Sequence, residues 1–186
     1  MSRLLRLAGV TTVLLIAPAI AAAQHDMAGH ESKHEFGADI AGMYQRFSLA
    51  GLSSNNILIG TPVDLRIGFV SGAKATVEPR IVFVFHSKGN SAGGAAYEFD
   101  PTLNFTWGFE SNKKGGYLTV GGALRMAHDT STQTQFGFNG GVGTRIPYEA
   151  GAIRLEAFGA YFLKKAADGI PNELDIGVRI GLSLWH

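Results

Sequence analysis

The sequence contains no cysteine, so no disulfide bond can stabilise the fold and no lipid can be attached through a cysteine after export. Charge is also scarce: Asp, Glu, Lys and Arg make up 17% of the 186 residues, and the formal net charge is +1. A chain without a basic excess has no electrostatic attraction for nucleic acid, which excludes a nucleic-acid partner. The chain must therefore be stabilised by its own burial or by a membrane.

Long hydrophobic runs are absent except at the start of the chain. Arg3 and Arg6 precede an apolar run that ends at Ile16, and Ala21–Ala23 supplies a small-residue cleavage signal. This order is typical of a secretory signal peptide, which we predict over residues 1–23. An uncleaved membrane helix is the alternative, but the run is short for a bilayer and a proline interrupts it. Any membrane crossing after this leader must use strands.

The next segment, residues 24–35, is polar and has no apolar period, so we expect a flexible, histidine-rich lead-in on the periplasmic side. Imidazole and carboxylate groups are good transition-metal ligands. The segment holds three of each, namely His25, His30 and His34 with Asp26, Glu31 and Glu35. Their spacing matches no tight site, so we assign no metal and no cofactor to the chain.

From Phe36 onward, polarity alternates with period two between short clusters of Gly, Asn, Asp, Ser and Pro, which predicts strands joined by hairpins. The predicted strands are residues 36–47, 57–70, 76–87, 95–109, 116–128, 134–147, 152–165 and 173–186. No segment has a helical period long enough for a crossover, so neighbours should pair antiparallel in chain order. Their length of about 12 to 14 residues exceeds the roughly 9 to 11 that cross a bilayer obliquely. We predict one domain over residues 36–186.

Charged and apolar side chains separate onto opposite faces of these strands. In the last segment, for example, Ile176 and Val178 alternate with Asp175 and Arg179. The polar face collects Asp39, Asp64, Arg66, Glu78, Arg80, Glu98, Asp100, Arg125, Arg145, Arg154, Glu156, Glu173, Asp175 and Arg179. Six arginines facing lipid would cost on the order of 12 to 24 kcal/mol, more than the typical total stability of about 5 to 15 kcal/mol. In a membrane barrel these charges must face inward and compensate one another.

Together, the predicted leader, the absence of cysteine, the eight alternating segments, the aromatic-rich apolar face and a last strand that ends the chain resemble a known family. The chain is similar to the small outer-membrane β-barrels of Gram-negative bacteria, the OmpA transmembrane domain and OmpX-like group, over residues 36–186. The resemblance implies an all-β, eight-stranded, antiparallel up-and-down transmembrane barrel, monomeric and surrounded by outer-membrane lipids. It also implies that the last strand is recognised by the barrel insertion machinery. Trp185 departs from the usual terminal aromatic residue, because it is penultimate and in the lumenal phase.

The leading functional hypothesis is a structural or surface-binding role in the cell envelope. Eight strands leave an interior that side chains fill, so we expect a charge network in the lumen and no open porin-like channel. With the C-terminus in the periplasm, the outer loops would be residues 48–56, 88–94, 129–133 and 166–172. All four are short, which disfavours a receptor that binds through long loops.

Two alternatives belong to other functional classes. A soluble, lipocalin-like periplasmic barrel would turn the apolar face inward around a ligand. An outer-membrane lipid-modifying hydrolase would need a nucleophile beside a base, and His86 with Ser87, or His128 with Ser131, are the candidate pairs. Neither pair forms the His-x-Ser-Asn arrangement of the lipid A deacylase group. We therefore assign no catalytic residue and expect the protein not to be an enzyme.

Overall fold

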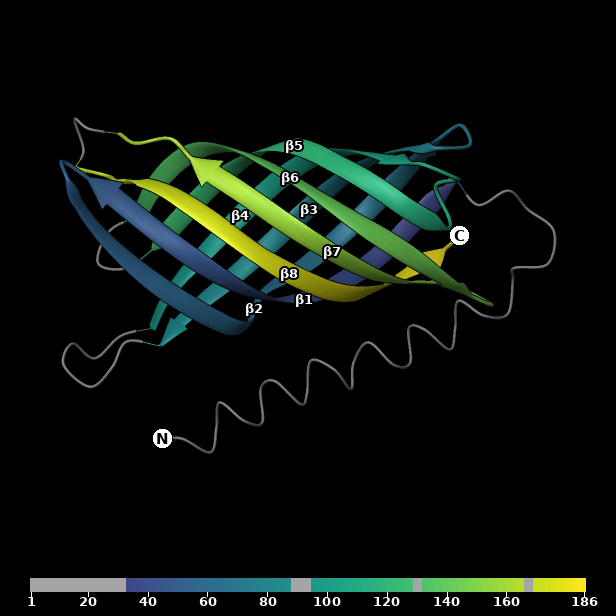
Figure 1. Cartoon of the computed structure of the whole chain (residues 1–186), viewed down its shortest axis with the longest axis horizontal. Helices are drawn as coiled ribbons and strands as arrows, with labels where there is room; N and C mark the ends of the chain where they lie inside the picture. The colour runs from purple at the N-terminus through teal and green to yellow at the C-terminus, as the bar shows by residue number, and fades with distance from the viewer. Residues whose placement is uncertain (1–32, 88–94, 129–131, 166–168) are drawn as a thin grey trace.

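The computed structural model describes residues 33–87, 95–128, 132–165 and 169–186, and the strands in these ranges close into one barrel (Figure 1). The strands are β1 (His34–Leu49), β2 (Leu52–Ser71), β3 (Ala75–Ser87), β4 (Ala95–Gly108), β5 (Gly115–His128), β6 (Thr132–Tyr148), β7 (Gly151–Phe162) and β8 (Asn172–Trp185). Each strand pairs antiparallel with the next, and β8 pairs with β1. Within these ranges, no helix has the length and hydropathy that a membrane crossing requires. The predicted fold class is confirmed.

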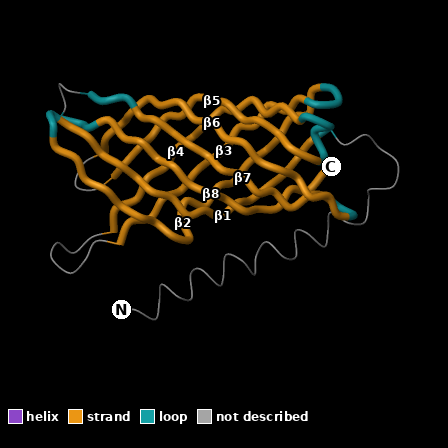
Figure 2. Tube along the Cα trace, viewed as in Figure 1, coloured by secondary structure: helices purple, strands orange, loops and turns teal. Residues whose placement is uncertain are grey.

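The faces of the strands follow the alternation of polarity in the sequence. Apolar side chains on the outside are exposed, for example Val178 at 64% and Phe138 at 65%, whereas Arg145 and Arg154 inside are among the largest fully buried side chains. The strands run obliquely around the long axis (Figure 2), as closure of a sheet requires. A lipocalin-like barrel would have the opposite distribution, with apolar residues inside.

Two predicted boundaries were wrong at the β1–β2 hairpin. β1 begins at His34, so the last two residues assigned to the flexible lead-in belong to the barrel. The predicted link over residues 48–56 shrinks to a two-residue turn, because Leu49 pairs with Leu52. Both turn residues have positive φ, 50° at Ala50 and 84° at Gly51, a geometry that suits the twist of a tight hairpin. The strands here extend well beyond the segments that alternation alone marks.

β2 is the irregular strand of the barrel. Its register with β1 shifts between the pairs Ile40–Val63 and Gly42–Ile59, so three residues of β2 oppose Ala41. Its pairing with β3 runs only from Val63 to Ser71, although β2 starts at Leu52. Figure 1 shows the β1–β2 hairpin and the end of β3 diverging at the end of the barrel opposite the C-terminus.

Candidate functional site

The barrel interior holds the charged residues predicted from the sequence. Thirteen of the fourteen are buried, and the side chain of the remaining one, Arg179, is 10% exposed. A further buried carboxylate, Glu35, lies with them although the sequence analysis placed it in the lead-in. Glu35 shares the inward phase of Asp39 four residues later, so extending the alternation by one step would have found it.

The ion pairs divide these residues into two groups. The group nearer the chain termini, here the balanced cluster, contains five guanidinium groups and five carboxylates: Arg66, Arg80, Arg145, Arg154, Arg179, Glu35, Asp39, Asp64, Glu78 and Glu156. The second group, here the acidic cluster, contains Arg125 with Glu98, Asp100, Glu173 and Asp175. The sequence predicted the members of both clusters except Glu35, but did not predict their division.

Arg154 of β7 lies at the centre of the balanced cluster. Its guanidinium group pairs with Glu78 across the lumen, and its Nη2 donates to Glu156 Oε2 at 3.1 Å. Its Nε donates to the Tyr117 hydroxyl at 3.1 Å, and that hydroxyl donates to Glu156 Oε2 at 2.8 Å. Because buried charges are tolerated only when they are paired and hydrogen-bonded, this geometry stabilises groups that would otherwise be costly.

Glu35 joins strands that are far apart in the sequence. Its Oε1 accepts a hydrogen bond from Ser183 Oγ at 2.6 Å, and its Oε2 accepts one from Arg145 Nη2 at 3.3 Å. Ser183 Oγ also accepts from Arg66 Nη2 at 2.6 Å. The first inward residue of the barrel therefore connects β1 to β2, β6 and β8. Tyr117 was missed from the sequence because a hydroxyl group carries no charge pattern to mark it, whereas Ser183 falls on the polar face of the last segment but was not assigned to the charge network.

The acidic cluster is organised around one cation. Arg125 Nη2 lies 3.0 Å from Asp100 Oδ2 and 2.8 Å from Asp175 Oδ2, and its Nε lies 3.4 Å from Glu98 Oε2. Its Nη1 pairs with Glu173, whose Oε1 also accepts a hydrogen bond from Gln45 Nε2. The guanidinium group also lies over the Phe162 ring, with its Cζ 3.7 Å from the ring centroid, so the ring covers one face of the group while the carboxylates bind its N–H edge.

Formal charge distinguishes the two clusters. Among the described side chains, the formal charges of the balanced cluster sum to zero, whereas one arginine and four carboxylates give the acidic cluster a formal charge of −3 when all are ionised. In addition, Asp100 Oδ1 and Asp175 Oδ1 are buried and meet no hydrogen-bond donor among the described residues. A buried excess of negative charge is costly, so this cluster gains from protons or from water that reaches these oxygens.

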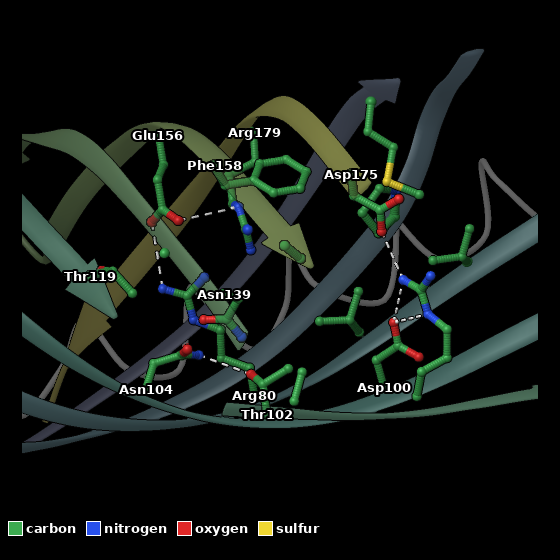
Figure 3. A pocket seen from close by; sticks show the side chains of 18 of the residues that line it. Arg80, Asp100, Thr102, Asn104, Thr119, Asn139, Glu156, Phe158, Asp175 and Arg179 are labelled. Atoms are coloured by element: carbon green, nitrogen blue, oxygen red, sulfur yellow. Dashed lines mark hydrogen bonds and ion pairs between the residues drawn. The ribbon is translucent and has the colours of Figure 1, made fainter. Parts of the chain in front are cut away.

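A small cavity of about 40 Å³ separates the two clusters (Figure 3). Figure 3 shows Arg80, Glu156 and Arg179 on one side of it and Asp100 with Asp175 on the other. A volume of this size holds about two water molecules. Side chains of both clusters line this cavity.

Of the residues considered for other chemistry, the structure describes the surroundings of His34 and His128, whereas the side chains of His86 and Ser87 lie outside the described part. His34 stacks edge-on against Phe69 on the outer face, opposite in phase to Glu35, while residues 24–32 of the histidine-rich segment lie outside the described part of the chain. In the described ranges, no group of three or more metal-ligating residues forms. His128 stacks on Tyr97 and contacts Thr132, whereas its proposed partner at position 131 lies outside those ranges.

Comparisons with solved structures identify the fold. The crystal structure of Neisserial surface protein A matches with a TM-score of 0.62 at 15% identity, covering 83% of this chain and 98% of that one. Ail, the attachment invasion locus protein of Yersinia pestis, matches with a TM-score of 0.54 at 12% identity over 83% of this chain and 100% of its own. The outer membrane protein OprG from Pseudomonas aeruginosa matches with a TM-score of 0.51 at 13% identity, covering 87% of this chain and 99% of that one.

Sequence comparison adds nothing to this, since neither a family model nor a curated protein matches the chain. At 12 to 15% identity, the structural matches establish the architecture and leave the role open. The chain has the fold of the small eight-stranded outer-membrane β-barrels, as the resemblance to the OmpA and OmpX-like group implied.

Proposed function

We propose that this chain is a monomeric, non-enzymatic outer-membrane protein with a structural or surface-binding role in the envelope, and that its lumen is closed by the two charge clusters. The observation that carries the proposal is the combination of an apolar exterior with a paired, charged interior. Such a molecule is stable only where lipid surrounds it, because water would oppose the exposed apolar side chains.

The outer face supports a membrane position in more detail. On β4, exposed aromatic residues lie at both ends of the outward row, with Tyr97 48% and Trp107 47% exposed. The ten residue steps from one ring to the other span about 25 Å at the tilt of a membrane strand, close to the height of the apolar band in such barrels. Aromatic rings at the two ends of the band favour the two lipid–water interfaces.

Export and assembly complete the proposal. Residues 1–23 would direct the chain across the inner membrane, and both ends of the barrel domain would lie in the periplasm, where β1 starts and β8 stops. The last strand would engage the insertion machinery through its apolar row, which includes Ile176, Val178 and Ile180. Trp185 is buried beside Arg145 and contributes to the lumen, so the insertion signal would depend on that row instead of the ring.

The decisive test is ion conductance of the purified protein in a planar bilayer. We expect no stepwise porin-like conductance from the native barrel, with compact gel mobility before boiling as proof of folding. Replacing Glu78 and Arg154 together by serine removes a buried pair without changing the net charge and enlarges the lumen. This double variant should conduct more than the native protein.

The matched control replaces Glu110 and Lys114 by serine. These two residues form an exposed ion pair outside the lumen, 3.7 Å apart, so conductance should stay at the native level. Steady porin-like conductance from the native barrel would exclude a closed lumen. Recovery of the native protein as a soluble periplasmic species would exclude the membrane position.

A further inference from the structure

The seam between β2 and β3 is incomplete. Their pairing ends at Val63 opposite Phe83, so in the described part of the chain Leu52–Ile59 pairs with β1 alone, and Gly60, Thr61 and Pro62 pair with neither neighbour. The other seven seams of the barrel pair over at least ten positions each. At the fork, Thr61 Oγ1 accepts a hydrogen bond from the Phe85 amide at 3.1 Å and lies 3.4 Å from the Phe83 carbonyl oxygen. The Thr61 side chain therefore takes the place of the backbone hydrogen bonds that the next pair of residues would form.

The fork lies within the apolar band of the outer face. Ile59 and Ile57 pair with Gly42 and Tyr44 of β1, which belong to the outward apolar row, and they are 88% and 76% exposed. On the other side of the fork, Phe85 is 60% exposed. Open sheet edges are not tolerated against hydrocarbon, because their amide and carbonyl groups then lack partners. Something with both apolar and hydrogen-bonding character must therefore cover this fork.

Directly behind the fork, the lumen wall is apolar instead of charged. Met43, Val84 and Phe158 are buried and pack together, with Leu58 and Val82 against them. All of these except Leu58 also line the cavity between the two charge clusters, as does Pro62 at the fork itself. Figure 3 places Phe158 beside Arg179 at this cavity.

We propose that the fork, the apolar cluster behind it and the adjoining cavity form a lateral binding site for a single-chain amphiphile from the membrane. The hydrocarbon tail would enter between β2 and β3 and end against Met43 and Val84. The head would hydrogen-bond to the free backbone edges of the fork. The site admits one chain end, since the cavity measures about 40 Å³ before Met43 moves, and a methionine side chain adapts readily to such a guest. This inference goes beyond the envelope role proposed above.

The test uses the native sequence in lipid nanodiscs with methyl-labelled methionine. The probe is stearic acid carrying a nitroxide at the middle of its chain, which leaves the methyl end free to enter the site and broadens nearby methyl signals. We expect saturable broadening of the Met43 methyl, reversed by unlabelled stearic acid. Met126 of β5 has the outward phase and should broaden in proportion to the probe without saturation. An unaffected Met43, or broadening of Met43 that does not saturate, would overturn the proposal.

Further variants distinguish lateral entry at the fork from entry through the mouth of the barrel. Val84→Phe fills the site and should weaken the apparent affinity at least tenfold, whereas Val120→Phe, on the exposed outer face of β5, should leave it unchanged. Gln135→Met places a reporter near Pro171, toward the far mouth of the barrel and away from the residues that line the cavity. Broadening there as strong as at Met43 would mean entry through the mouth and would refute the fork. Equal saturable broadening by a nitroxide-labelled diacyl phospholipid would refute the single-chain occupant.

Discussion

Both charge clusters of the lumen pair buried guanidinium groups with buried carboxylates, but the ratio of cations to anions differs between them. In the balanced cluster, five guanidinium groups face five carboxylates. The carboxylate oxygens of a single residue, Glu78, lie within 3.5 Å of guanidinium nitrogens of Arg66, Arg80 and Arg154. In the acidic cluster, the described side chains offer one cation, Arg125, to four carboxylates. The balanced cluster has redundant pairs, whereas the acidic cluster depends on one residue. Stability should therefore respond differently to matched changes in the two places.

The largest effect is expected from removing an arginine from each cluster. Arg125→Met removes the guanidinium group that pairs with all four buried carboxylates, so the barrel should fail to fold at neutral pH. Arg154→Met leaves four other guanidinium groups in its cluster, so we expect folding with a loss of about 3 to 5 kcal/mol. Urea unfolding followed by the change in gel mobility measures both.

Acidification sharpens this comparison. Protonation removes negative charge from unpaired carboxylates, so lowering the pH should partly restore folding of Arg125→Met by reducing repulsion among them. A folded Arg125→Met barrel at neutral pH, together with an unfolded Arg154→Met barrel, would show that formal charge does not determine the stability of these clusters.

A smaller effect is expected from removing one carboxylate from each cluster, and the change in stability should differ in sign or size between the two clusters. Glu78→Gln breaks pairs with three arginines and should lower the free energy of unfolding by about 3 kcal/mol. Glu173→Gln reduces the repulsion in the acidic cluster and keeps an oxygen that accepts from Gln45, so stability should stay within about 1 kcal/mol or increase. Equal losses from the two substitutions, in the same unfolding assay, would remove the distinction between the clusters.

The smallest effect is expected from a neutral member of the balanced cluster. Ser183→Ala removes one hydroxyl that donates to Glu35 and accepts from Arg66, at a cost of about 1 to 2 kcal/mol. Ser54→Ala, at an exposed position of β2, should change stability by less than about 0.5 kcal/mol. If the two variants unfold at the same urea concentration, Ser183 does not contribute to the network.

The sequence predicted the strands well because alternation is a local property. Ile176, Val178 and Arg179 face outward and inward as their positions in the strand require. The hairpin at Ala50 was less predictable, since Leu52–Asn56 has no alternation and is held in β2 by pairing with β1. Glu35 was lost for a related reason: strand β1 starts before the apolar pattern does, because closure against Trp185 of β8 extends it.

The site was predictable in membership but not in arrangement. The alternation of polarity with period two assigned fourteen charged residues to one face of the strands, and thirteen of them are buried. Which carboxylate meets which arginine could not be read from the same pattern, since Glu78 and Arg154 lie on β3 and β7, on strands that do not pair. The incomplete pairing of β2 with β3 could not be predicted from the sequence either. Gly60 and Pro62 mark a bulge in β2, but they do not show at which residue the pairing with β3 ends.

The sequence by itself determined that this chain forms long antiparallel strands with one apolar and one charged face, since side-chain direction repeats every two residues along any strand. Only the tertiary structure decided how the charges are shared, five against five near the termini and one against four beyond the cavity. The physical reason is that contacts across a barrel depend on the stagger between strands, and that stagger is fixed only when the last strand closes on the first.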